Sequence, residues 1–126
     1  MKLSNLFVFN SIVALVYGIG SVVMPVTLLS LHGMTQGPTE ALVGQFMGVS
    51  MIAIGLITWL ARNITDSEAK KAIITGLLIS DVIGFIVVLL GMLSNLMNAL
   101  GWVAAGIYLV LTLGYAYFGF LKPEVT

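Results

Sequence analysis

Residues 72–93 read AIITGLLISDVIGFIVVLLGML, and this stretch decides the fold of the chain. Asp81 is its one charged residue. An α-helix needs about 20 mostly apolar residues to cross the roughly 30 Å hydrocarbon core of a bilayer. The stretch meets that length and composition, so it predicts a transmembrane helix.

Three further apolar segments lie outside this stretch, at about residues 5–24, 40–61 and 99–121. The chain of 126 residues is 60% hydrophobic and only 8% charged, whereas roughly a quarter of the residues are charged in soluble domains. With so few charged residues, the folded chain could not present a polar surface to water. We predict an all-α fold, an integral membrane four-helix bundle that forms a single transmembrane domain over residues 1–126 in the lipid bilayer.

The five Lys and Arg residues all fall on one side of the predicted spans. The connections between the first and second spans and between the third and fourth contain none. Cytoplasmic loops retain Lys and Arg because these residues resist translocation. We therefore predict a multi-pass protein with cytoplasmic N- and C-termini, on the evidence of Lys2, Arg62, Lys70, Lys71 and Lys122.

Two local signals predict where helices begin and end. Pro25 should stop or kink the first helix, because proline lacks a backbone donor and clashes with the preceding turn. Residues 26–31 would then form either one last tilted turn or a short piece at the outer interface. Residues 65–68, Thr-Asp-Ser-Glu, match a capping box, so we expect the third helix to begin near Asp66 in water and to enter the bilayer near Ala72.

The composition also excludes several kinds of chemistry. The chain has no Cys and a single His, so thiol redox chemistry, disulfides and thiolate metal sites cannot form. No Ser has a His at its depth, and no metal-ligand spacing or phosphate-binding loop is present. We expect no enzymatic activity, no metal or cofactor, and, with a net charge of zero, no nucleic-acid partner.

Small residues recur at helical spacing in the second and third predicted spans. Such stripes let helix backbones approach closely, which drives association where lipid removes the hydrophobic effect between helices. The stripes serve either packing inside the bundle or an interface with another chain, and the sequence leaves both alternatives open. The predicted packing residues are Gly44, Gly48, Gly55, Ala72, Gly76, Ser80, Gly84 and Gly91.

Asp81 is the strongest candidate for a functional residue, because its position lies about 14 Å inside the span. An ionised carboxylate at that depth costs several kcal/mol unless it is paired or hydrated. We expect a largely protonated Asp81 that donates a hydrogen bond to another helix. The candidate partners are Ser50 and Thr112 at similar depth, and Tyr17 and Tyr108 slightly nearer the outside.

Three roles for Asp81 remain open: a neutral interhelix hydrogen bond, a proton- or cation-carrying group, or a partner for a cation on a ligand or another protein. Asn10, Ser11 and Gln45 are expected to make interhelix hydrogen bonds. His32 is expected to be a solvated residue of the outer loop.

Three segments carry a resemblance to DoxX-like proteins, small bacterial membrane proteins with four helices. They are Pro25 followed by residues 28–33 (LLSLHG), residues 58–62 (TWLAR) and residues 98–102 (NALGW). The resemblance implies a four-helix fold in the bacterial inner (plasma) membrane. The Cys-based redox roles of some DoxX-like proteins cannot transfer to a chain without Cys.

Two functional hypotheses follow. The first is a structural or accessory subunit that packs with itself, as a homo-oligomer, or with a larger membrane protein complex through its small-residue faces. The second is an oligomeric proton- or cation-coupled transporter or channel for a small solute that uses Asp81.

Overall fold

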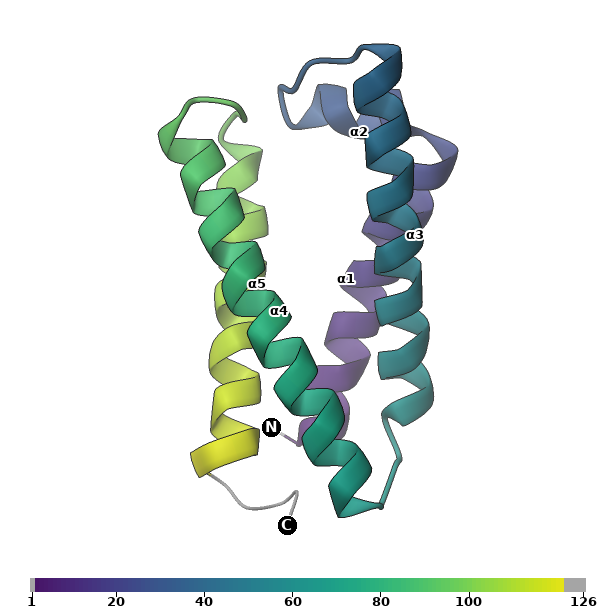
Figure 1. The fold of residues 1–126 in the computed structure, drawn as a ribbon, viewed down its shortest axis with the longest axis vertical. Coiled ribbons are helices and arrows are strands. Elements are labelled where there is room, and N and C mark those ends of the chain that lie inside the picture. The colour runs from purple at the N-terminus through teal and green to yellow at the C-terminus, as the bar shows by residue number, and fades with distance from the viewer. Residues whose placement is uncertain (1, 122–126) are drawn as a thin grey trace.

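The computed structural model describes residues 2–121, which place Lys2, Arg62, Lys70 and Lys71 but leave Lys122 outside the described part. Over these residues the chain is helical and contains no strand. The helices are α1 (Leu3–Val23), α2 (Pro25–Leu31), α3 (Pro38–Ala61), α4 (Ser67–Leu93), α5 (Leu100–Ala116) and the π-helical turn η1 (Tyr117–Leu121) (Figure 1). Four segments are long and apolar enough to cross a membrane, namely α1, α3, α4 and α5 with η1. The predicted all-α, four-span fold is confirmed.

The break between α1 and α2 lies at the predicted proline. Met24 leaves the helical conformation, with φ −133° and ψ 61°, and Pro25 occupies the first turn of α2. Proline is tolerated there because its missing N–H would have had no partner in a first turn. Residues 25–31 therefore form a separate short helix, one of the two alternatives that the sequence left open.

The start of α4 differs in detail from the predicted capping box. Asp66 is the N-cap residue, and its carboxylate accepts a hydrogen bond from the backbone N–H of Glu68 over 3.2 Å. The short side chain of Asp66 reaches the backbone N–H two residues ahead. Asp66 therefore caps the helix in place of Thr65, the residue that the predicted capping box required. The predicted start near residue 66 is confirmed, with a different cap.

The four spans form two antiparallel pairs, α1 with α3 and α4 with α5 (Figure 1). In the first pair the backbones approach closely at Gly18 and Gly48. A Cβ built on Gly48 would lie 2.7 Å from the carbonyl oxygen of Gly18 and 2.9 Å from Cβ of Ser21. Gln45 adds an interhelix hydrogen bond, donating from Nε2 to the carbonyl oxygen of Val22 over 3.1 Å.

The two pairs meet at both ends of the bundle. At the end where the chain begins, they share an apolar core. At the opposite end, the backbone N–H of Asn98 donates to the carbonyl oxygen of His32 over 2.9 Å, and its Nδ2 donates to that of Leu31 over 2.9 Å. The buried residues of the core are Leu3, Leu6, Phe7, Ala61, Ile74, Leu111, Tyr115 and Phe118.

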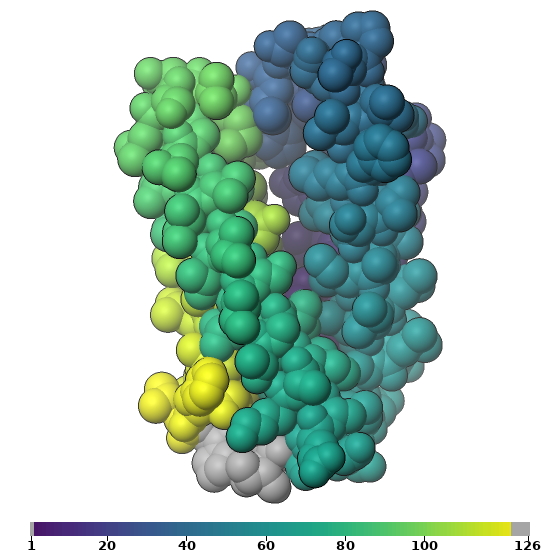
Figure 2. All heavy atoms as spheres, in the orientation of Figure 1, coloured from purple at the N-terminus to yellow at the C-terminus, as the bar shows by residue number. Residues whose placement is uncertain are grey.

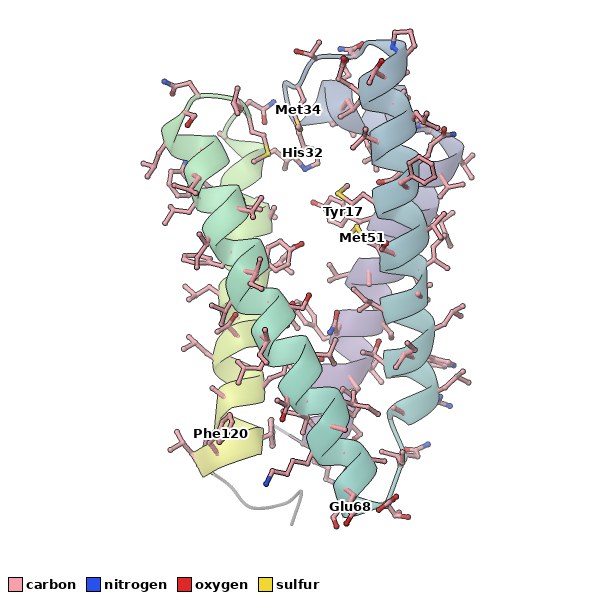
Figure 3. The ribbon with its side chains drawn as sticks, viewed as in Figure 1. Tyr17, His32, Met34, Met51, Glu68 and Phe120 are labelled. Atoms are coloured by element: carbon pink, nitrogen blue, oxygen red, sulfur yellow. The ribbon has the colours of Figure 1, made fainter. Side chains whose placement is uncertain are left out.

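Between these two junctions the pairs stand apart, and the surface is hollowed between them above the middle of the molecule (Figure 2). We call this hollow the lateral cleft. Tyr17 and Met51 extend from α1 and α3 toward the α4–α5 pair, and His32 and Met34 lie above them (Figure 3). The cleft thus opens between the two helix pairs on the face that Figure 2 shows.

Candidate functional site

The register of α4 against α5 determines which residues face Asp81. Glycines on one helix lie against side chains of the other, so a Cβ built on each would meet its neighbour. The two helices run antiparallel, and these contacts place Asp81 level with Thr112. The contacts are Gly84 against Tyr108, Gly101 against Met92, and Gly119 against Ile74.

Asp81 and Thr112 each carry a buried polar atom without a partner. The side chain of Asp81 is only 6% exposed. Its Oδ2 atom and the Oγ1 atom of Thr112 have no hydrogen-bond partner among residues 2–121. Most buried polar atoms in proteins are hydrogen-bonded, so two unpartnered buried oxygens at a similar level of the α4–α5 pair require an explanation. The neutral interhelix hydrogen bond expected from Asp81 is not formed by Oδ2.

Two tyrosines of α5 lie near the level of Asp81 or one turn from it. The ring of Tyr108 lies over Gly84, one turn from Asp81 along α4. Tyr115 is fully buried, and its Oη accepts a hydrogen bond from Nδ2 of Asn10 on α1 over 2.7 Å. This bond joins α1 to α5 and so links the two helix pairs.

The other two candidate partners lie elsewhere. Ser50 is exposed on α3, and its hydroxyl donates to the carbonyl oxygen of Phe46 on the same helix over 3.4 Å. Tyr17 extends from α1 toward the α4–α5 pair (Figure 3), with its ring 5.8 Å from the ring of His32. The structure therefore places Thr112 and Tyr108 on the helix that packs against α4, near the level of Asp81, and leaves Ser50 exposed on α3.

His32 is buried, contrary to the expectation of a solvated loop residue. Its side chain is 9% exposed, and Nδ1 lies 3.0 Å from the carbonyl oxygen of Leu28. The expectation failed because α2 turns back after Pro25, and its C-cap residue, His32, packs beside the ring of Tyr17 on α1. Pro25 and the short apolar run after it were the sequence features that could have predicted this burial of His32.

The sequence predicted only one member of the Asn10–Tyr115 hydrogen bond. Asn10 was expected to make an interhelix hydrogen bond, and it does. Tyr115 was not among the candidates, because a tyrosine near the end of a span is usually an interfacial anchor. Ser11 differs from the expectation, since its hydroxyl donates to the carbonyl oxygen of Val8 on its own helix over 2.7 Å.

The small residues divide into inward and outward sets. Gly48, Gly55 and Gly84 would each place a Cβ within 3 Å of another helix, whereas Gly91 faces only the flexible end of Met97. Gly44 and Gly76 have nothing within 4 Å of a built Cβ. On α4, Ala72 and Ser80 are exposed beside Gly76. We call Ala72, Gly76 and Ser80 the outward stripe.

These features define a small multi-pass α-helical membrane protein that carries a buried carboxyl group, Asp81, within one of its spans. Within residues 2–121, no three His, Asp or Glu side chains lie close enough to hold a metal ion together. The chain matches, over residues 1–121, the family model described as Domain of unknown function (DUF8292), and it belongs to that family. No curated protein and no solved structure matches the chain. The DoxX-like resemblance stays a prediction.

Proposed function

We propose that the protein is a self-associating structural component of the membrane, whose copies pair through the outward stripe of α4. The observation that carries this proposal is the open space around Gly76. A built Cβ there meets no atom within 4 Å, while Ala72 and Ser80 lie exposed one turn before and one turn after it.

The spacing of the outward stripe suits a second copy of this chain. Small residues at four-residue intervals let two membrane helices cross in close contact. Copies inserted in the same orientation are related by a two-fold axis along the membrane normal, so each residue meets its own counterpart at equal depth. A stripe of small residues is therefore complementary to itself without any change of shape.

The burial of the four spans supports the use of α4. Of its most apolar window, 11% is buried inside the chain, compared with 39% for α1. Among the four spans, α4 thus has the largest share of its apolar window left to pack against a neighbour. Pairing of two copies is the simplest assembly that this face supports, and docking into a larger membrane complex is the other assembly that the same face could serve.

A bulky substitution at Gly76 tests the proposal. Because its surroundings are open, Gly76→Leu should leave the single chain folded and abolish pairing. Gly44→Leu is a matched control, since that glycine is equally open but lies on α3. Particle mass in mild detergent should show a dimer for the wild type and for Gly44→Leu, and a single chain for Gly76→Leu. A dimer in all three samples would refute the interface, and a fixed stoichiometry with another protein would replace the second copy by that partner.

A second candidate function, proton- or cation-coupled transport, is favoured by the unpartnered carboxylate oxygen of Asp81. Asp81→Asn keeps the shape and hydrogen-bonding capacity of the side chain and removes its ability to carry a proton or a charge. Flux into liposomes by the purified protein should then be lost. Coupled flux that persists in Asp81→Asn would exclude the carrier role.

A further inference from the structure

A pocket with three cationic side chains lies at the end of the bundle where the chain begins. Its volume is about 230 Å³. The start of α1, the end of α3 and the start of α4 lie together at this end (Figure 1). Each of the three contributes one cation to the pocket, namely Lys2 before α1, Arg62 after α3 and Lys70 in α4.

We propose that this pocket, which we call the basic pocket, binds the phosphate headgroup of an anionic phospholipid. The acyl chains of the lipid stay in the surrounding bilayer. This inference concerns binding at the helix ends, and it requires neither the pairing of copies nor transport.

The positive charge of the basic pocket is not balanced by acidic groups of the described chain. Among residues 2–121, no carboxylate lines the pocket, and neither Lys2 nor Lys70 forms an ion pair. Asp66 and Glu68, at the start of α4, are exposed, and the Asp66 carboxylate accepts a hydrogen bond from the backbone N–H of Glu68. Opposite charges attract more strongly near a protein surface than in bulk water, so a phosphate group is a favourable counter-charge for these cations.

Arg62 is already held in position beside the pocket. Its Nη1 donates to the carbonyl oxygen of Trp59 over 2.6 Å, and its Cζ lies 3.9 Å from the centroid of the Trp59 ring. A guanidinium group has five N–H donors in a planar fork, so one bond to a carbonyl leaves donors for a phosphate. An ordered side chain also loses less conformational entropy on binding. Because Trp rings prefer the headgroup level of a bilayer, Trp59 indicates that Arg62 lies where lipid phosphates are found.

The size and the lining of the basic pocket favour a headgroup that belongs to a lipid. Pockets that enclose a complete drug-sized ligand have volumes of about 300–1,000 Å³, so this smaller pocket suits a polar headgroup and not an entire lipid. Leu3, Phe7 and Ala61 line it and are also part of the buried apolar core. An apolar lining beside cations suits an amphipathic molecule better than a fully hydrated ion. Basic pockets between membrane helices bind anionic headgroups by the same chemistry.

Quenching of Trp59 fluorescence in the full chain in detergent micelles tests the proposal. The chain has 2 tryptophans, and Trp102, exposed near the start of α5, is replaced in Trp102→Phe so that only Trp59 reports. The probe is phosphatidylglycerol with brominated acyl chains. Phosphatidylcholine with the same chains is the control, because it has the phosphate but no net charge. We expect saturable quenching and a preference for phosphatidylglycerol of at least about fivefold, the contribution of one Lys or Arg near an anionic lipid surface.

Two neighbouring lysines separate the basic pocket from the general charge of this end. Lys70→Gln removes a cation that lines the pocket and should lower the preference for phosphatidylglycerol about fivefold. Lys71→Gln is the matched control, because it removes the same charge from the next position of α4, which is exposed and does not line the pocket. Lys2→Gln should lower the preference as Lys70→Gln does, although it alters a different helix. An unchanged far-UV circular dichroism spectrum shows that each variant remains folded.

Equal quenching by the two lipids would overturn the proposal. An unchanged preference in Lys70→Gln would also overturn it, and so would equal losses in Lys70→Gln and Lys71→Gln, which would assign the preference to general surface charge. Inorganic phosphate separates the lipid from a free anion. At equal ionic strength it should displace brominated phosphatidylglycerol no more than sodium chloride does. Stronger displacement by phosphate would assign the pocket to the free anion and overturn the assignment to a lipid.

Discussion

The close contact between α1 and α3 can be tested by one methyl group. Gly48→Ala would place Cβ 2.7 Å from the carbonyl oxygen of Gly18 and 2.9 Å from Cβ of Ser21. One of these is a backbone atom and the other is bonded directly to the backbone, so neither can turn away like the end of a long side chain. Overpacking of this kind costs about 1–3 kcal/mol.

The control is Gly76→Ala on α4, where the added methyl group meets no atom within 4 Å. Alanine also replaces glycine favourably in helices, by about 0.5–1 kcal/mol in water. Both variants gain that contribution, so the difference between them isolates the packing cost. We expect Gly48→Ala to be less stable than Gly76→Ala by about 1–3 kcal/mol in the free energy of unfolding.

The assay is reversible unfolding in mixed micelles with increasing sodium dodecyl sulfate, followed by the fluorescence of Trp59 and Trp102. The protein is kept dilute enough to remain a single chain, because pairing would add its own free energy. Equal unfolding free energies for the two variants would refute the argument that α1 and α3 are held together by backbone contact at Gly48.

Three further predictions concern the junctions of the helix pairs and the orientation of the chain. Tyr115→Phe leaves the buried amide of Asn10 without its acceptor and should lower the free energy of unfolding by about 0.6–2 kcal/mol, measured by the same titration. Asn98→Ala removes the side-chain bond to Leu31 of α2 and the bond that its Oδ1 accepts from the backbone N–H of Leu100, but keeps the backbone bond. It should cost about 1–3 kcal/mol for the two bonds and speed amide exchange in residues 31–34. In intact cells an impermeant maleimide should label Ser94→Cys and spare Asn63→Cys, because the basic connection is predicted to be cytoplasmic.

Each of these predictions has a control and a contradicting result. Tyr117→Phe alters an exposed ring and should leave stability unchanged; an equal loss in both tyrosine variants would contradict the role of the Asn10 bond. Ser94→Ala, also exposed, is the control for the exchange experiment, and unchanged exchange in Asn98→Ala would show that the side chain does not hold this end closed. Labelling of Asn63→Cys alone would invert the predicted topology.

The spans were predictable because lipid constrains the sequence so strongly. A membrane helix must be long, apolar and internally hydrogen-bonded. The length and apolar composition of residues 72–93 meet these requirements. The break at Pro25 was predictable for the same local reason, because a proline removes a donor from the helix. Features that depend only on residues close together in the chain can therefore be predicted from a single sequence.

The arrangement of the spans was not predictable in this way. Gly48 and Gly76 lie in similar small-residue stripes, yet one touches a neighbouring backbone and the other faces open space. Ser50 and Thr112 have similar predicted depths, but Ser50 is exposed on α3, whereas Thr112 lies on α5, the helix that packs against α4. Depth along a span follows from counting residues, whereas rotation about the helix axis depends on partners that are distant in the sequence.

Because the lateral cleft is closed at both ends, a molecule that binds there must enter from the lipid. This route determines how its binding affinity must be measured. Such a molecule dissolves in the bilayer before it binds, so its membrane partition coefficient is part of every apparent affinity. Each added methylene favours partitioning by about 0.8 kcal/mol, close to a fourfold change in concentration within the lipid. A series of homologous compounds would therefore appear to bind more tightly with chain length when doses are expressed per volume of water. Expressed per mole of lipid, the same series would reveal the contribution of the site itself.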